Sequence, residues 1–218
     1  MDSTYLIKAQ NLSHSFEHTL YDGINLEVES GESVAILGVS GSGKSTLINN
    51  LSTLLAPKKG KVSLNNKDDI YSLSSNELLK IRQSEIGIIF QFHYLFRGFS
   101  ALENLQVSSI ISKQSIDIEL LESFEIAHIL NQQIGELSGG QQQRLSIARV
   151  LTKKPKIIFA DEPTGNLDKD TTLKVMQVVF DYIAKNNSCM FIATHNIELA
   201  KMCNRCFYLK DSKLERVI

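Results

Sequence analysis

The residues from Gly38 to Thr46 have the types and the spacing needed to bind a chain of phosphate groups. They read Gly38, Val39, Ser40, Gly41, Ser42, Gly43, Lys44, Ser45 and Thr46, which fits the pattern G-x-x-x-x-G-K-[ST]. Glycines in such a loop let consecutive backbone N–H groups point at phosphate oxygens, because no Cβ blocks their approach. Lys44 is placed to neutralise β- and γ-phosphate oxygens, and the Ser45 hydroxyl is placed to ligate a phosphate-bound Mg²⁺. We therefore predict that these residues bind a nucleoside triphosphate, although the pattern alone also fits an ordinary glycine-rich turn.

Two adjacent acids, Asp161 and Glu162, follow the apolar run Ile157–Ala160. A carboxylate at such a position can hold Mg²⁺, directly or through water, and its neighbour can activate an attacking water. We assign Asp161 to the metal and Glu162 to the role of general base, because adjacent residues at a strand end point to opposite sides. Considered alone, the pair also fits a solvated turn.

A second helix start suited to binding an anion lies at Ser138, Gly139 and Gly140. A serine and two glycines there precede a segment with helical apolar spacing at Leu145, Ala148 and Leu151. The chain thus carries two phosphate-binding helix ends.

The elements that must position these residues are short buried strands that alternate with helices, which indicates a mainly parallel α/β sheet. Four strands are predicted at Val34–Leu37, Ile86–Phe90, Lys156–Ala160 and Cys189–Ala193. Sites in such sheets collect at the carboxyl ends of the strands, where Gln91, Asp161 and His195 fall.

The other segments predict two further parts of the fold. Residues 5–32 alternate in polarity, with turn signals at Asp22-Gly23 and Ser30-Gly31, and predict an antiparallel β layer. Residues 61–64 resemble another strand, and Ser74 with Glu77 predicts a capped helix. Residues 92–135 have helical spacing and predict a helical insertion in a single domain that spans residues 1–218.

Composition limits the classes of partner. The 218 residues carry a net charge of −1 with both signs interspersed, so no basic stripe indicates nucleic acid as a partner. The N-terminus has no basic and apolar leader and no window of membrane-spanning apolar length, so we expect no direct insertion into a membrane. The three cysteines, Cys189, Cys203 and Cys206, are expected to be reduced thiols rather than zinc ligands.

The run Leu137-Ser138-Gly139-Gly140-Gln141 matches the signature of ABC-type ATPases, and the chain resembles that family over nearly its whole length. The resemblance implies a P-loop NTPase fold, ATP and Mg²⁺ as ligands, and a homodimer in which Ser138–Gln141 meet the γ-phosphate bound to the other subunit. It also implies that Gln91 senses Mg²⁺ and the attacking water and that Asp168 lies in a loop crossing the dimer interface. His195 would hold the γ-phosphate and Phe16 would stack on adenine, where many members have Tyr. Taken alone, His195 also fits a core histidine, and Phe16 fits a buried cluster with Leu12.

Three further runs, residues 90–95, 101–105 and 160–168, resemble the lipoprotein-releasing (LolD-type) ATPases, which are similar to the macrolide-exporter and cell-division (FtsE-type) ATPases. Departures from that branch are Arg97 and Gly135, where proline is frequent, and Asn196, where aspartate is common. This resemblance implies an ATPase at the cytoplasmic face of the bacterial inner membrane that drives a separate permease to release lipoproteins. The alternatives are an ATP-gated scaffold of the cell-division type and an exporter-type ATPase without lipoprotein transport.

An aromatic-rich stretch follows Gln91, and it contains Phe92, Tyr94, Leu95, Phe96 and Phe99. We expect Gln91 to act as a hinge between the sheet and the helical insertion. Two or three of the apolar residues are expected to line a groove that receives a short helix of the permease. The alternative is that all five pack inside the insertion.

Overall fold

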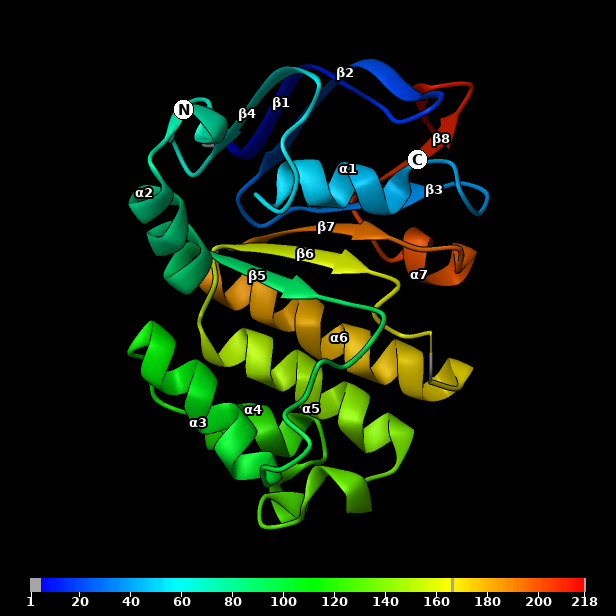
Figure 1. Cartoon of the computed structure of the whole chain (residues 1–218). Helices are drawn as coiled ribbons and strands as arrows, with labels where there is room; N and C mark the ends of the chain where they lie inside the picture. Colours follow the sequence, from blue (N-terminus) through cyan, green and yellow to red (C-terminus); the bar gives the residue numbers. More distant parts are fainter. Residues whose placement is uncertain (1–4, 166, 218) are drawn as a thin grey trace.

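The central sheet brings the carboxyl ends of its parallel strands to one edge of the molecule (Figure 1). The computed structural model describes residues 5–165 and 167–217. In spatial order the strands are β5 (Ile86–Ile89), β6 (Ile157–Asp161), β7 (Cys189–Ala193), β3 (Ser33–Leu37), β8 (Arg205–Lys210) and β9 (Lys213–Arg216). Every neighbouring pair is parallel except β8 and β9, which form an antiparallel hairpin. The four predicted parallel strands are thereby confirmed.

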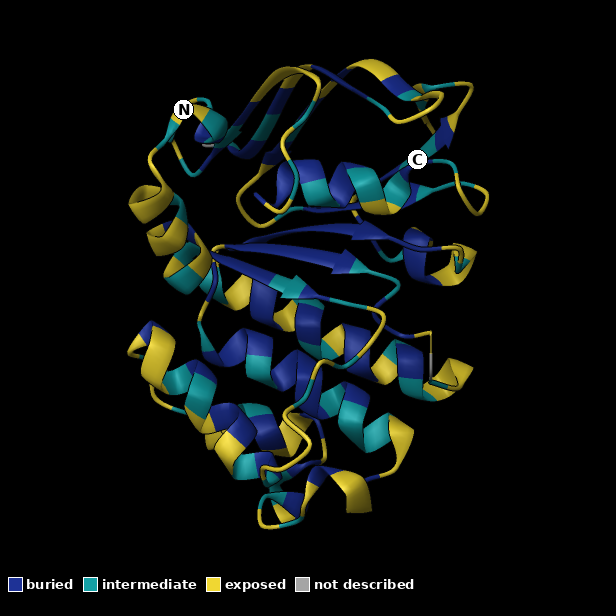
Figure 2. Ribbon diagram, in the orientation of Figure 1, coloured by how far each residue is buried: buried dark blue, intermediate teal, exposed yellow. Residues whose placement is uncertain are grey.

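Strands β3, β6 and β7 are buried along nearly their whole length because helices cover both faces of the sheet (Figure 2). Their sequences are accordingly continuous apolar runs rather than alternating ones. Helix α1 (Lys44–Leu51) covers one face, and α5 (Gly139–Thr152) and α6 (Lys169–Asn186) lie on the other (Figure 1).

A second, antiparallel sheet packs over α1 and is formed by β2 (Thr19–Glu29), β1 (Tyr5–Ser15) and β4 (Lys59–Leu64). It confirms the predicted antiparallel layer. The turn predicted at Asp22-Gly23 is wrong, because β2 runs through these two residues. The register between β1 and β2 shifts here, and Gly23 has a φ of 68°. The Asp-Gly pair therefore marks a β-bulge, for which glycine supplies the left-handed conformation.

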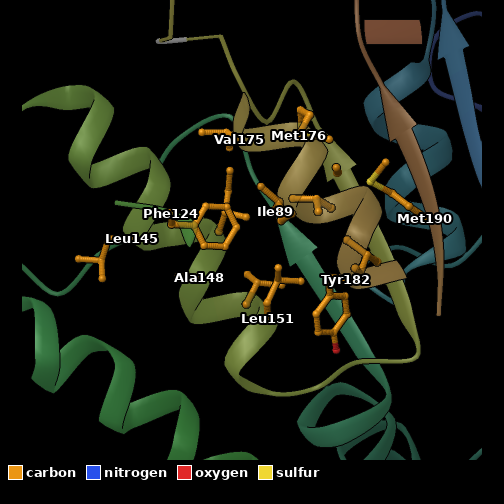
Figure 3. Packing of buried hydrophobic residues seen from close by; sticks show 14 of the residues in the cluster. Ile89, Phe124, Leu145, Ala148, Leu151, Val175, Met176, Tyr182 and Met190 are labelled. Carbon is orange, nitrogen blue, oxygen red and sulfur yellow. The ribbon is translucent and has the colours of Figure 1, made fainter. Parts of the chain in front are cut away.

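The helical part of the chain lies beyond α6 and shares one hydrophobic core with it (Figure 3). It contains α3 (Ala101–Ser112), α4 (Ile118–Ser123) and 3₁₀ turns at Ala127–Ile129 and Ile134–Glu136. Phe124 is fully buried among Leu145, Ala148 and Leu151 of α5 and residues of α6. Truncating such a side chain costs about 3–5 kcal/mol. Helix α5 therefore belongs to the hydrophobic cluster that joins one face of the central sheet to α6 and the helical part, and its position is fixed on several sides.

The remaining elements are short. They are a 3₁₀ turn at Ile70–Ser72, α2 (Ser75–Lys80), a π turn at Ile81–Glu85 and α7 (Ile197–Lys201). Ser74 caps α2 and Glu77 completes the capping box, as predicted from the sequence. Strands β8 and β9 had no counterpart among the predicted elements. Cys206 and Leu209 of β8 are buried, with Phe207 and Tyr208 between them half-buried, so the strand lacks the clear alternation that signals a half-exposed strand.

Candidate nucleotide site

The glycine-rich loop joins the end of β3 to the start of α1, as the pattern requires. Gly43 caps α1 with a φ of 102°, and Gly41 has a φ of 77°. A Cβ at Gly43 would lie 3.1 Å from the Cβ of Leu20 on β2, in addition to the strain of a left-handed conformation. Glycine is thus required at this position on both conformational and steric grounds.

A cavity of about 550 Å³ opens beside this loop. It is lined by Phe16, Leu20, Gly38, Ser40, Gly41, Gly43, Lys44, Ser45, Thr46, Gln91, Asp161, Glu162 and His195. All but Leu20 are predicted site residues: Glu162 was predicted as the general base, and the others were predicted to bind ATP, metal or phosphate. The cavity therefore brings together residues from five separate segments of the chain.

Two loop residues face elsewhere. Val39 and Ser42 line a neighbouring hollow of about 360 Å³ that shares Leu20 and Gly41 with the cavity. The Ser42 Oγ is buried without a hydrogen-bond partner among the described residues. Val39 and Ser42 thus do not line the larger cavity, although they belong to the loop that does.

Lys44, Ser45 and Asp161 form the charged floor of the cavity. The Lys44 ammonium donates to the backbone carbonyls of Gly38 at 2.8 Å and Val39 at 3.0 Å. Burial raises the pKa of the Asp161 carboxyl, and a hydrogen bond from Ser45 opposes that rise. The charge of Glu162 raises this pKa further, whereas the charge of Lys44 lowers it. A cation placed between Ser45 and Asp161 would favour the ionised carboxylate.

Glu162 and His195 face each other across the mouth of the cavity. Glu162 Oε2 lies 3.0 Å from His195 Nδ1. The Glu162 side chain is 17% exposed and that of His195 is 76% exposed, so the interpretation of His195 as a core histidine is wrong. Glu162 has a φ of 46°, and its N–H donates to the Ala193 carbonyl at 2.9 Å. A left-handed glutamate costs about 1–2 kcal/mol. The backbone bond to β7 holds it in that conformation.

Phe16 also lines the cavity. It is 63% exposed, whereas Leu12 is fully buried, so the interpretation of Phe16 as a member of the core is wrong. The ring of His14, which is buried, meets the Phe16 ring edge-on at a centroid distance of 4.9 Å. One face of Phe16 therefore stays available for a planar base.

The second predicted anion site and Asp168 do not line this cavity. Ser138 caps α5, accepting from Gln141 N–H at 3.2 Å, and Gln141 Oε1 accepts from Ser138 N–H at 2.8 Å. Ser138 and Gly139 are exposed. Asp168 caps α6 with a 2.9 Å hydrogen bond from the Thr171 N–H, and bonds to Thr171 keep its carboxyl pKa low. These groups are thus presented outward from the chain.

The sequence interpretation missed a row of polar residues on α5 that bond to the backbone of the segments next to the cavity. Gln143, Ser146 and Arg149 recur at a spacing of three, which places them on one side of the helix. Gln143 Nε2 donates to the carbonyl of Pro163, which follows Glu162. The signal in the sequence was three polar residues at a spacing of three on a predicted helix. In the structure Gln143 and Ser146 are buried and Arg149 is half-buried.

Within residues 5–165 and 167–217, no helix is long and apolar enough to cross a lipid bilayer. The same residues contain no group of three or more His, Cys, Asp or Glu side chains that could hold a metal ion.

Comparisons with known proteins agree with this geometry. A family model described as "ABC transporter" matches residues 21–165. The "Lipoprotein-releasing system ATP-binding protein LolD 2" of Caulobacter vibrioides is 42% identical over 199 residues, covering 88% of this chain and 87% of that protein. The LolD protein of Bdellovibrio bacteriovorus is 39% identical over 197 residues, covering 88% of this chain and 89% of that protein.

Solved structures of ABC transporter cassettes are also similar to this chain. A bacterial ABC transporter cassette determined as a dimer has a TM-score of 0.87 at 36% identity, over 96% of this chain and 97% of that one. The same cassette in a dimeric post-hydrolysis state, bound to ADP and phosphate, also has a TM-score of 0.87, at 35% identity over the same shares of the two chains.

Proposed function

The chain belongs to the ATP-hydrolysing subunits of the ABC transporter family, and on that basis we propose that it drives a separate membrane permease that releases lipoproteins from the inner membrane. Its fold is the cassette fold of that family, as predicted from the sequence. The observation that carries the proposal for the site is the cavity that gathers Phe16, the glycine-rich loop, Gln91, Asp161, Glu162 and His195.

ATP binds in this cavity with its base on the exposed face of Phe16 and its phosphates along residues 38–46. Lys44 and the N-terminal end of α1 supply positive charge to the β- and γ-phosphates. Glu162 removes a proton from the attacking water, and His195, held at 3.0 Å from Glu162, contacts the γ-phosphate side.

Mg²⁺ fits the oxygen donors on the floor of the cavity. The Ser45 hydroxyl, the Asp161 carboxylate and the Gln91 amide are hard ligands, and Ser45 already bonds to Asp161. A site with few protein ligands suits Mg²⁺, which takes its other ligands from phosphates and water. The ion would neutralise charge that develops on the phosphates.

The outward placement of Ser138–Gln141 and Asp168 supports a homodimer that closes on two ATP molecules. In such a dimer Ser138, Gly139, Gly140 and Gln141 approach the γ-phosphate bound to the other subunit, and Asp168 lies at the interface. One similar cassette has been solved as a dimer in two states.

The aromatic residues after Gln91 are the surface that we assign to the permease. Phe92, Tyr94, Phe96 and Phe99 are all exposed, whereas Leu95 packs against the core. The interpretation in which all five pack inside is therefore wrong. An exposed aromatic group of this kind suits an amphipathic helix laid into a groove. Binding there would hold the chain at the cytoplasmic face of the membrane.

The substrate is tested in proteoliposomes that contain the chain, its candidate permease and a fluorescent lipoprotein. We expect release that requires ATP and stops in the Glu162→Gln variant. Release of a macrolide but not of lipoprotein would assign an exporter. ATP-dependent permease binding with no transported molecule would assign a regulatory scaffold.

A further inference from the structure

The segment that leaves the nucleotide cavity after Gln91 is held to α5 by its backbone. The His93 carbonyl accepts from Ser146 Oγ at 3.1 Å and from Arg149 Nη2 at 3.3 Å. The Tyr94 carbonyl accepts from Arg149 Nη1 at 3.0 Å. The planar guanidinium thus spans two consecutive carbonyls, which a lysine could not do with the same geometry. In Figure 1 this segment descends from β5 alongside α5.

The environment of Arg149 makes these bonds its principal interactions. Among the residues that the structure describes, no carboxylate forms an ion pair with Arg149, and burial lowers the pKa of its guanidinium. The charge lies 5.8 Å from the centre of the Phe96 ring. A half-buried charge without a carboxylate is costly unless its donors are used, so the two carbonyls are tightly bound to it.

The bonds also hold a strained backbone. Tyr94 has a φ of 46°, a conformation that costs a residue with a Cβ about 1–2 kcal/mol. On the far side, the Asn104 amide of α3 brackets the segment, accepting from Phe96 N–H at 2.8 Å and donating to its carbonyl at 3.2 Å. Residues 93–96 are therefore fixed from both helices, and Gln91 is only two residues away.

The same side of α5 reaches the catalytic strand end. Gln143 lies six residues before Arg149 and is fully buried. Its side-chain amide donates to the Pro163 carbonyl. A displacement of α5 would thus act on the backbone next to Glu162 and on the backbone next to Gln91 together.

We propose that Arg149 is a positioning residue for hydrolysis: it fixes the backbone of His93 and Tyr94 to α5, and α5 thereby sets where the Gln91 amide lies in the nucleotide cavity. The inference rests on the proposed role of Gln91. It gives the helix that begins at Ser138 a direct connection to the ATP site of its own subunit, in addition to the contact proposed for its N-terminus across the dimer.

The test is a double-mutant cycle on kcat, with Arg149→Met, Gln91→Ala and the double variant. Loss of positioning should lower kcat on the order of ten- to a hundred-fold in Arg149→Met, while ATP binding, measured with a fluorescent ATP analogue, stays within about threefold. In the Gln91→Ala variant, adding Arg149→Met should lower kcat by less than about twofold, because the amide that Arg149 positions is already absent. Arg149→Lys should recover part of the rate, since an ammonium can bond to one carbonyl at a time.

Arg144→Met is the matched control on the same helix, where Arg144 Nη1 lies 3.6 Å from Glu125 Oε2. It should keep wild-type kcat. If the losses from Arg149→Met and Gln91→Ala multiply, Arg149 does not act through Gln91 and the inference fails, while the proposed function stands. If Gln91→Ala itself has wild-type kcat, the role of Gln91 fails and the inference fails with it. Should Arg149→Met not fold, the cycle is run with Arg149→Lys, and the same two outcomes decide.

Discussion

Replacing Glu162 by Gln separates the chemistry of the site from its geometry. Glutamine keeps an oxygen that can accept from His195 Nδ1, which lies 3.0 Å from Glu162 Oε2 in the wild type. It also keeps the N–H that donates to Ala193, so the left-handed backbone at this position remains supported. What is lost is the carboxylate that can take a proton.

A positioned general base contributes about 10²–10⁴-fold to a rate, which is about 2.7–5.4 kcal/mol of transition-state stabilisation. We expect kcat to fall by that factor. ATP affinity should stay the same or increase, because the charge of Glu162 raises the pKa of the Asp161 carboxyl and its removal favours the ionised metal ligand. Tight binding without hydrolysis should trap a closed dimer.

Two measurements check this expectation. One is steady-state phosphate release. The other is size-exclusion chromatography with light scattering, with and without saturating Mg·ATP. Glu215→Gln, on the exposed surface of β9, is the matched control and should keep wild-type values in both. Hydrolysis at more than about a tenth of the wild-type rate in Glu162→Gln would refute the assignment of the base. Loss of hydrolysis with no ATP-dependent dimer would refute the closed homodimer instead.

Three further predictions concern other parts of the molecule. Lys44→Ala should weaken ATP binding and abolish hydrolysis, because the phosphates lose their main cation, and wild-type rates would overturn the loop assignment. Tyr94→Ser and Phe96→Ser, at side chains 65% and 48% exposed, should move the thermal midpoint by less than about 4 °C yet abolish co-purification with the permease. A larger fall in the thermal midpoint together with loss of the permease would mean that the substitution destabilises the chain, and it would refute the assignment of these side chains to the permease surface. Burial lowers the pKa of the Lys153 ammonium to about 8 from its ordinary value of 10.5. The unfolded chain therefore binds more protons between these values, and the urea midpoint should rise with pH there, less so in Lys153→Met.

The parallel strands β3, β5, β6 and β7 could be predicted because each is mostly buried and is read from a single apolar run. Ile157–Ala160 and Cys189–Ala193 are such runs, and their ends place Asp161 and His195. Fold class predicted that these ends share one edge of the sheet. The structure adds that β6 and β7 are neighbours, with Asp161 paired to Ala193. Strand β8 was not predicted, because Phe207 and Tyr208 are half-buried and interrupt its buried positions. The β-bulge at Gly23 was predicted as a turn, because a bulge and a turn can both require a glycine in the left-handed conformation.

Residue chemistry identified Lys44, Ser45, Asp161 and Glu162 in the cavity lining, and the family resemblance identified Phe16, Gln91 and His195. The residues that hold them in place were not identified. The role of a phosphate-binding lysine or of a strand-end carboxylate can be predicted from the residue type and its sequence neighbours. Arg149 has a role that depends on which backbone carbonyls lie opposite it, and those belong to residues more than fifty positions earlier in the chain. Spacing on α5 indicates only that Gln143, Ser146 and Arg149 share one side of the helix. The contacts of that side depend on how α5 packs between β5, α3 and α6. Positioning residues of this kind can therefore be identified only from the three-dimensional structure.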